Sequence, residues 1–106
     1  MSADKEIFTV DEKIVEKNLS AARRGSREAA FNLALMYEEG VGIPQDYRRA
    51  VEWYRMAAQL GHPEAQFHLG WLYQHGLGVE VDWLKAIEWY RKAADQGHQS
   101  ARIMLG

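Results

Sequence analysis

The sequence contains no cysteine and only two prolines among its 106 residues. The lack of cysteine excludes disulfide bonds, thiolate catalysis and cysteine-ligated zinc. No apolar run approaches the roughly 18 residues that a membrane span requires, so we predict no membrane insertion. The segment Met1-Ser2-Ala3-Asp4-Lys5-Glu6 is polar and does not resemble a secretory signal. Together with the absence of cysteine, this leads us to expect a cytoplasmic protein.

An excess of positive charge is also missing. The chain has 13 lysines and arginines against 15 aspartates and glutamates, which gives a formal net charge of −2. A general surface for nucleic acid or anionic lipid needs a basic excess, so we predict neither as a partner. The apolar share of 47% instead indicates one folded domain with a well-filled core.

What the chain does contain is an internal repeat. Residues 28–63 align with residues 64–99 without a gap, and 17 of the 36 aligned positions are identical. The same register continues outward on both sides, where it matches half a unit before and the first turns of another unit after. We therefore divide the single domain into a flexible N-terminus at 1–8, an N-terminal capping half repeat at 9–27, repeat 1 at 28–63, repeat 2 at 64–99 and the truncated first helix of a further repeat at 100–106.

Each unit predicts two helices. Apolar residues at helical spacing place the first helix at about 27–38 in one repeat and 63–74 in the next. An earlier helix is expected from the capping box Thr9-Val10-Asp11-Glu12 to about Arg24. The expected N-caps are Ser26, His62 and His98 for the first helices and Asp46 and Asp82 for the second, with Gly40 and Gly76 ending the first helices. No stretch shows the two-residue period of a strand.

Two residue strings carry a resemblance to a known family. They are Ala65-(x)3-Leu69-Gly70-(x)2-Tyr73-(x)2-Gly76-Leu77-Gly78-Val79 and Asp82-(x)2-Lys85-Ala86-(x)2-Trp89-Tyr90-(x)-Lys92-Ala93-Ala94-(x)2-Gly97. Both resemble the Sel1-like repeat, and repeat 1 resembles it with Ala34, Arg49 and Met56 at three family positions. The resemblance implies an all-α protein, a right-handed α/α superhelical solenoid of Sel1-like helix hairpins similar to tetratricopeptide arrays. It also implies a non-enzymatic adaptor, often bacterial, that binds proteins. Some secreted members pair cysteines across each hairpin, and this chain has none.

The histidines, glycines, serines and carboxylates of the sequence also favour a non-enzymatic protein. His68 and His75 are seven residues apart on one predicted helix, about 10 Å along its axis, which is too far for the two to share a metal ion. The glycine pairs of the turns are not followed by Lys-Ser or Lys-Thr, so they do not form a phosphate loop. No serine has a nucleophile motif, and carboxylates such as Glu52 and Glu88 recur with the repeat. We predict no catalytic residue, no metal and no cofactor.

A partner surface is expected where the two repeats differ, because repeated residues build the scaffold. By analogy with tetratricopeptide arrays, the first helices should line the concave face. The candidate binding residues are the non-repeating ones on the outward side of these helices: Asn32, Leu35, Glu38, Glu39, His68, Trp71, Gln74 and His75. Tryptophan is enriched at interface hot spots, so Trp71 is the leading candidate. The alternative is that Trp71 packs between neighbouring first helices as ordinary core. Glu38 and Glu39 favour a basic or neutral peptide.

Two functional hypotheses follow. The first is a protein- or peptide-binding adaptor module, and the alternative is an enzyme or enzyme-associated subunit that uses a groove of His68, Trp71 and His75. Tyr47 and Trp83, another unequal pair, are expected to pack under the loops. At the other end of the chain, Ile103-Met104-Leu105 cannot all be buried by one neighbouring helix, so we predict self-association through the C-terminal end.

Overall fold

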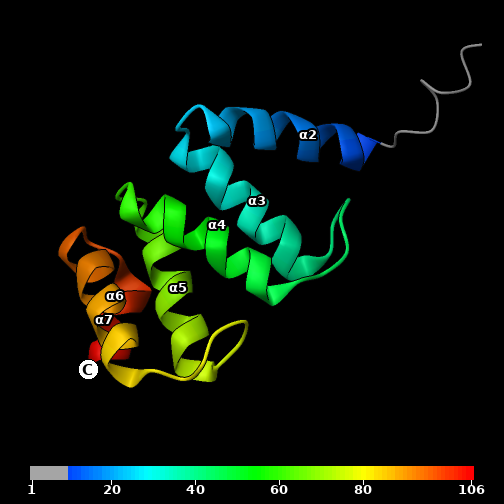
Figure 1. The fold of residues 1–106 in the computed structure, drawn as a ribbon. Coiled ribbons are helices and arrows are strands. Elements are labelled where there is room, and N and C mark those ends of the chain that lie inside the picture. The colour runs from blue at the N-terminus through cyan, green and yellow to red at the C-terminus, as the bar shows by residue number, and fades with distance from the viewer. Residues whose placement is uncertain (1–9) are drawn as a thin grey trace, which may run out of the picture.

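The computed structural model describes residues 10–106. This part of the chain forms helices and no strand, as predicted (Figure 1). The six helices are α2 (Val10–Arg23), α3 (Arg27–Glu39), α4 (Tyr47–Gln59), α5 (Pro63–His75), α6 (Trp83–Asp95) and α7 (Gln99–Leu105). The predicted flexible segment 1–8 and the Thr9 cap lie outside the described residues.

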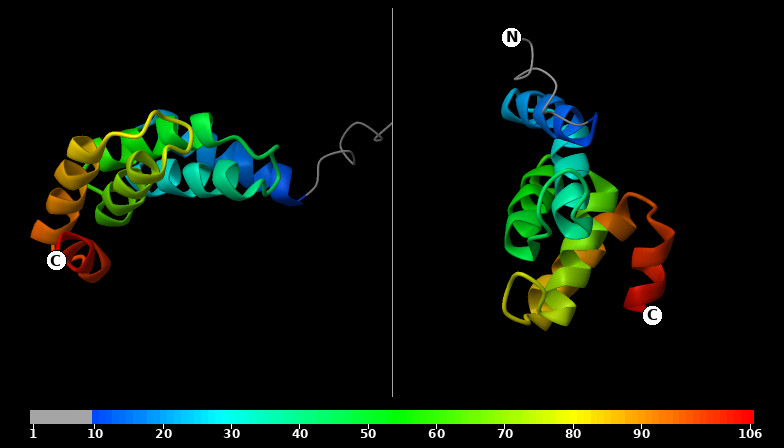
Figure 2. Two further views of the ribbon diagram at one scale, coloured as in Figure 1. Left: turned by 90° about the horizontal axis from the view of Figure 1, so that it is seen from below. Right: turned by 90° about the vertical axis from the view of Figure 1, so that its right-hand side faces the viewer.

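The helices stack in one direction. Each helix packs mainly against the helix before it and the helix after it, and α3–α4 and α5–α6 form antiparallel hairpins. The body measures 59 × 23 × 19 Å, and its radius of gyration of 15.3 Å exceeds the ~13 Å of a compact domain of this length. Figure 2 shows α2 and α7 at opposite ends of the body. This is the architecture of an α/α solenoid, in which each unit contacts its neighbours.

The predicted helix ends are confirmed. The side chains of Ser26, His62 and His98 each accept a hydrogen bond from the backbone N–H three residues ahead, and so do those of Asp46 and Asp82. Gly40 and Gly76 close α3 and α5 in the left-handed conformation, with φ of 73° and 68°. Only glycine adopts this conformation without strain, which explains its place at both helix ends.

Small residues let the helices of a hairpin approach closely. Alanines fill much of the core, among them Ala34, Ala50, Ala57, Ala86 and Ala93. In repeat 2 the position of Ala34 is taken by Gly70, where an added Cβ would lie 2.9 Å from the Tyr90 ring and 3.0 Å from the Ala86 carbonyl oxygen. Such a distance is shorter than van der Waals contact, so the spacing of α5 and α6 depends on this glycine.

Each repeat is covered by the one that follows it. The turn between α5 and α6, residues 76–82, packs against the start of α4. A Cβ on Gly78 in this turn would lie 2.4 Å from the carbonyl oxygen of Tyr47. Val51 on α4 is 2% exposed, whereas Ile87, its counterpart on α6, is 37% exposed. Tyr47 is half-buried under this turn, as expected. The prediction that Trp83 packs under a loop is wrong: Trp83 is 59% exposed, because among the described residues no later turn covers it.

Candidate functional site

Four side chains from two first helices line a cavity of about 180 Å³. Glu38 comes from the last turn of α3, and Phe67, His68 and Trp71 come from α5. We call this cavity the α3–α5 pocket. Because Phe67 matches Phe31 in the repeat, the rule that repeated residues build the scaffold excludes it, and sequence reasoning missed it. The signal that could have found it is its position four residues before Trp71, which places both side chains on the same helical face.

The ring of His68 joins the pocket to the packed interior. It stacks on the Tyr54 ring at 5.1 Å between ring centroids, with 7° between the ring planes. The Phe31 ring meets it edge-on at 5.7 Å. Burial lowers the pKa of His68 below its usual value, although Glu38 and Glu64 act in the opposite direction. The imidazole is therefore neutral at pH 7.

A partly buried hydrogen bond holds Glu38 beside the pocket. The Tyr54 hydroxyl donates to Oε1 of Glu38 at 2.6 Å, which occupies one of the two carboxylate oxygens. Burial raises the pKa of Tyr54, and the hydrogen bond to Glu38 raises it further, so the hydroxyl keeps its proton and remains the donor.

Repeat 2 makes the same hydrogen bond with an uncharged partner. The Tyr90 hydroxyl donates to Oε1 of Gln74, also at 2.6 Å, and burial raises the pKa of Tyr90 to about 12. Gln74 and Glu38 occupy equivalent positions of the repeat, so an amide oxygen serves this bond as well as a carboxylate does. The negative charge of Glu38 is not required by the fold.

Trp71 shows features of both roles considered from the sequence, a contact for a partner and ordinary core packing. The indole is half-buried and packs against core residues, while it also lines the pocket. Its ring lies 4.0 Å from the ring of His75, measured between centroids. His75 is exposed, and its Nδ1 donates a hydrogen bond to the Trp71 carbonyl oxygen at 2.9 Å.

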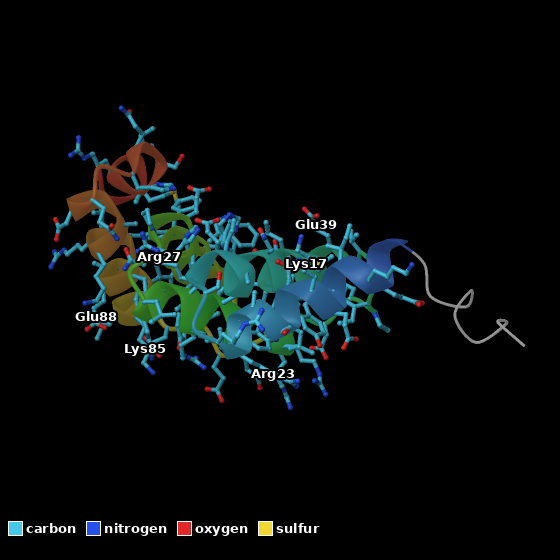
Figure 3. All side chains as sticks on the ribbon, turned by 90° about the horizontal axis from the view of Figure 1, so that it is seen from above. Lys17, Arg23, Arg27, Glu39, Lys85 and Glu88 are labelled. Atoms are coloured by element: carbon cyan, nitrogen blue, oxygen red, sulfur yellow. The ribbon has the colours of Figure 1, made fainter. Side chains whose placement is uncertain are left out.

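The structure brings only three of the eight predicted residues, Glu38, His68 and Trp71, into the pocket. Asn32 donates a hydrogen bond from Nδ2 to Oδ1 of Asn18 on α2 at 3.2 Å. Leu35 packs against the core, and Gln74 makes the scaffold bond to Tyr90. Glu39 is exposed, and its carboxylate points away from the helices (Figure 3).

Two other histidines have structural positions. His62 accepts from the Ala65 backbone N–H at Nδ1 and donates from Nε2 to Glu28 at 3.0 Å, linking the start of α5 to α3. His98 repeats this arrangement with Ala101 and Glu64. In the part of the chain that the structure describes, no three histidine, aspartate or glutamate side chains group closely enough to hold a metal ion. None of the helices in residues 10–106 is long and apolar enough to cross a membrane.

Comparisons with known proteins agree with the fold. The family model "Sel1 repeat" matches residues 27–62 and 63–98. Among solved structures, a protective antigen of uropathogenic Escherichia coli with an SLR fold is 40% identical, with a TM-score of 0.81 over 82% of this chain and 19% of its own. A Sel1 repeat protein from Oxalobacter formigenes is also 40% identical, with a TM-score of 0.83 over 85% of this chain and 37% of its own.

A third similar structure supports the fold alone. The cysteine-rich protein B of Helicobacter pylori is 24% identical, with a TM-score of 0.86 over 91% of this chain and 72% of its own. No curated protein sequence matches. The chain spans only 19% of the Escherichia coli antigen and 37% of the Oxalobacter formigenes protein, well under half the length of either. Because the family model covers both repeats, which make up most of the chain, the chain belongs to the Sel1-repeat family.

Proposed function

We propose that this chain is a non-catalytic protein- or peptide-binding adaptor module whose partner binds along α3 and α5. Sel1-repeat proteins generally mediate protein–protein interactions and are generally not enzymes. The observation that carries the proposal is the α3–α5 pocket, where Trp71 stands in place of the Leu35 of repeat 1. A non-repeating, half-exposed tryptophan beside a cavity has the features of an interface hot spot.

The size of the pocket favours a side chain over a metabolite. Small-molecule sites typically enclose roughly 300–1,000 Å³, and this cavity has about 180 Å³. The lining is mainly apolar, with one carboxylate at its edge. Such a site accepts one residue of an extended peptide while the rest of the peptide lies along the helices.

The enzyme alternative has less support. His68 is neutral and stacks on the Tyr54 ring, and its Nε2 lies 3.9 Å from Oε2 of Glu64, beyond hydrogen-bond distance. His75 directs Nδ1 to the backbone of Trp71. General acid–base catalysis needs a base within hydrogen-bond reach of its proton and oriented by a partner, and this arrangement does not supply that pair.

Selection of peptides from a random displayed library tests the proposal. Peptides selected on the wild-type chain should bind Trp71→Leu, which copies Leu35 of repeat 1, roughly tenfold or more weakly. The matched control is Trp83→Tyr, which copies Tyr47 and leaves the pocket intact. Equal affinity of the wild type and Trp71→Leu, measured by fluorescence polarisation, would remove the pocket as the binding site.

A further inference from the structure

We infer that the α3–α5 pocket binds a basic side chain, arginine or lysine, of the partner peptide, with the Glu38 carboxylate as its counter-ion. The inference rests on the proposed function and adds to it the chemistry of the residue that enters the pocket. It follows from three features of the site: a charge that the fold does not need, aromatic walls, and an acidic neighbourhood.

The charge of Glu38 is the first feature. Tyr54 needs a hydrogen-bond acceptor, and Gln74 shows that an amide oxygen fulfils this role for Tyr90 at the same distance. A carboxylate in place of the amide therefore adds only charge. It lines a mainly apolar cavity, so a cation that enters the cavity can pair with it.

The walls of the pocket suit a long basic side chain. Phe67 and Trp71 provide aromatic surface, against which the methylene stem of arginine or lysine can pack while its charged end remains near water. Guanidinium and ammonium groups are also attracted to the faces of aromatic rings, most strongly to tryptophan. His68 is the remaining pocket residue on α5, and it adds no opposing charge because burial lowers its pKa and keeps it neutral.

The surroundings are acidic as well. The charges that act on Tyr54, the hydrogen-bond donor to Glu38, are the carboxylates of Glu38, Glu39 and Glu64. A basic peptide is attracted to such a region, and an acidic peptide is repelled from it. Charge complementarity therefore selects a basic occupant over an acidic or a purely aliphatic one.

The test uses three capped tripeptides, acetyl-glycyl-X-glycine amide, in which X is arginine, lysine or citrulline. Citrulline has the shape of arginine without its charge. Each is titrated into the ¹⁵N-labelled chain while the indole signal of Trp71 and the backbone amides of α5 are followed. We expect the arginine and lysine peptides to shift these signals and to bind roughly three- to tenfold more tightly than the citrulline peptide.

Glu38→Gln is the decisive variant, because it copies Gln74 and keeps the acceptor for Tyr54. It should unfold at the wild-type temperature and abolish the preference for arginine over citrulline. Glu88→Gln, which removes an exposed charge on α6 outside the pocket, should retain that preference. An unchanged preference in Glu38→Gln would overturn the inference, as would equal binding of arginine and citrulline peptides to the wild type.

The outcomes also separate this inference from the proposed function. If library-selected peptides without basic residues shift Trp71 and bind Glu38→Gln as well as wild type, the pocket binds peptides but not through a cation. If neither the tripeptides nor library-selected peptides perturb Trp71, both the inference and the proposed function fail. Self-association that alone shifts Trp71 in dilution series, without added peptide, would assign the pocket to a second copy of the chain and overturn the inference.

Discussion

At the scale of single residues, His68 makes the stability of the folded chain depend on pH. Burial lowers its pKa in the folded chain, so the folded state resists protonation while the unfolded chain keeps the ordinary value of 6.5. As the pH falls below about 6.5, the unfolded chain takes up a proton that the folded chain does not. This residue therefore contributes a loss of stability toward acid, down to its lowered pKa.

His68→Asn tests this contribution, because Asn32 occupies the same position in repeat 1. The free energy of unfolding of the wild type should fall more steeply between pH 7 and pH 5 than that of the variant. Urea unfolding at several pH values measures both slopes. Parallel profiles of the two proteins would show that His68 titrates alike in the folded and unfolded chains.

Gly78 is a second residue whose identity the packing decides. Its φ is +75°, and a Cβ would lie 2.4 Å from the Tyr47 carbonyl oxygen. Gly78→Ala should cost about 3 kcal/mol, from backbone strain together with overpacking. The control is Gly97→Ala, at φ +91° with no atom within 4 Å of the added Cβ, which should cost only about 1–2 kcal/mol. Chemical denaturation measures both losses. If the two variants lose the same free energy of unfolding, the contact between Gly78 and α4 adds no steric cost, which would contradict this prediction.

At the scale of elements, His62 has two functions at the start of α5. Its Nδ1 caps the helix, and its ring stacks on Phe31 at 4.5 Å while Nε2 reaches Glu28. Ser26, at the start of α3, provides the cap alone. The histidine thus joins a helix end to the preceding first helix.

Two substitutions separate these functions. His62→Ala should destabilise the chain by about 2–3 kcal/mol, because it removes the cap, the aromatic stack and the link to Glu28. His62→Ser restores a good N-cap and should recover about 1 kcal/mol of that loss. Thermal and urea unfolding measure the difference. If serine recovers nothing, the cap is not what histidine contributes at this position.

The elements were largely predictable from the sequence, and the pocket only in part. Helix ends could be placed because Ser26, Asp46 and Gly40 act through local hydrogen bonds and backbone conformation. The hydrogen bond between Tyr54 and Glu38 joins residues on two helices, so its formation depends on how the hairpin closes. Phe67 repeats, so the sequence rule places it in the scaffold, yet a repeated residue can line a cavity when its neighbour changes.

At the scale of the whole molecule, the last helices present apolar side chains to solvent. Leu84 is exposed on α6, and Ile103 on α7 is 75% exposed, while only Ala101 of α7 is buried. Ile87 on α6 is also 37% exposed, whereas its counterpart Val51 on α4 is 2% exposed because the next repeat covers it. Exposed apolar surface of this kind favours association.

We therefore expect the chain to self-associate through this end. The sedimentation coefficient should increase with protein concentration, and Ile103→Lys should reduce that increase. Gln59→Lys, at an exposed position near the end of α4, serves as a charge-matched control and should leave it unchanged. A wild-type chain that sediments as a monomer up to high concentration would contradict this expectation.

The central claim is that the α3–α5 pocket binds the partner, and the chain's four tryptophans allow a direct test. Each indole gives its own N–H signal in a ¹H–¹⁵N spectrum, so one titration with a library-selected peptide reports on all four sites. The account predicts that the Trp71 signal shifts most, and that the signal of Trp83, outside the pocket, is unchanged. A peptide that shifts Trp83 or Trp53 and leaves Trp71 in place would contradict it.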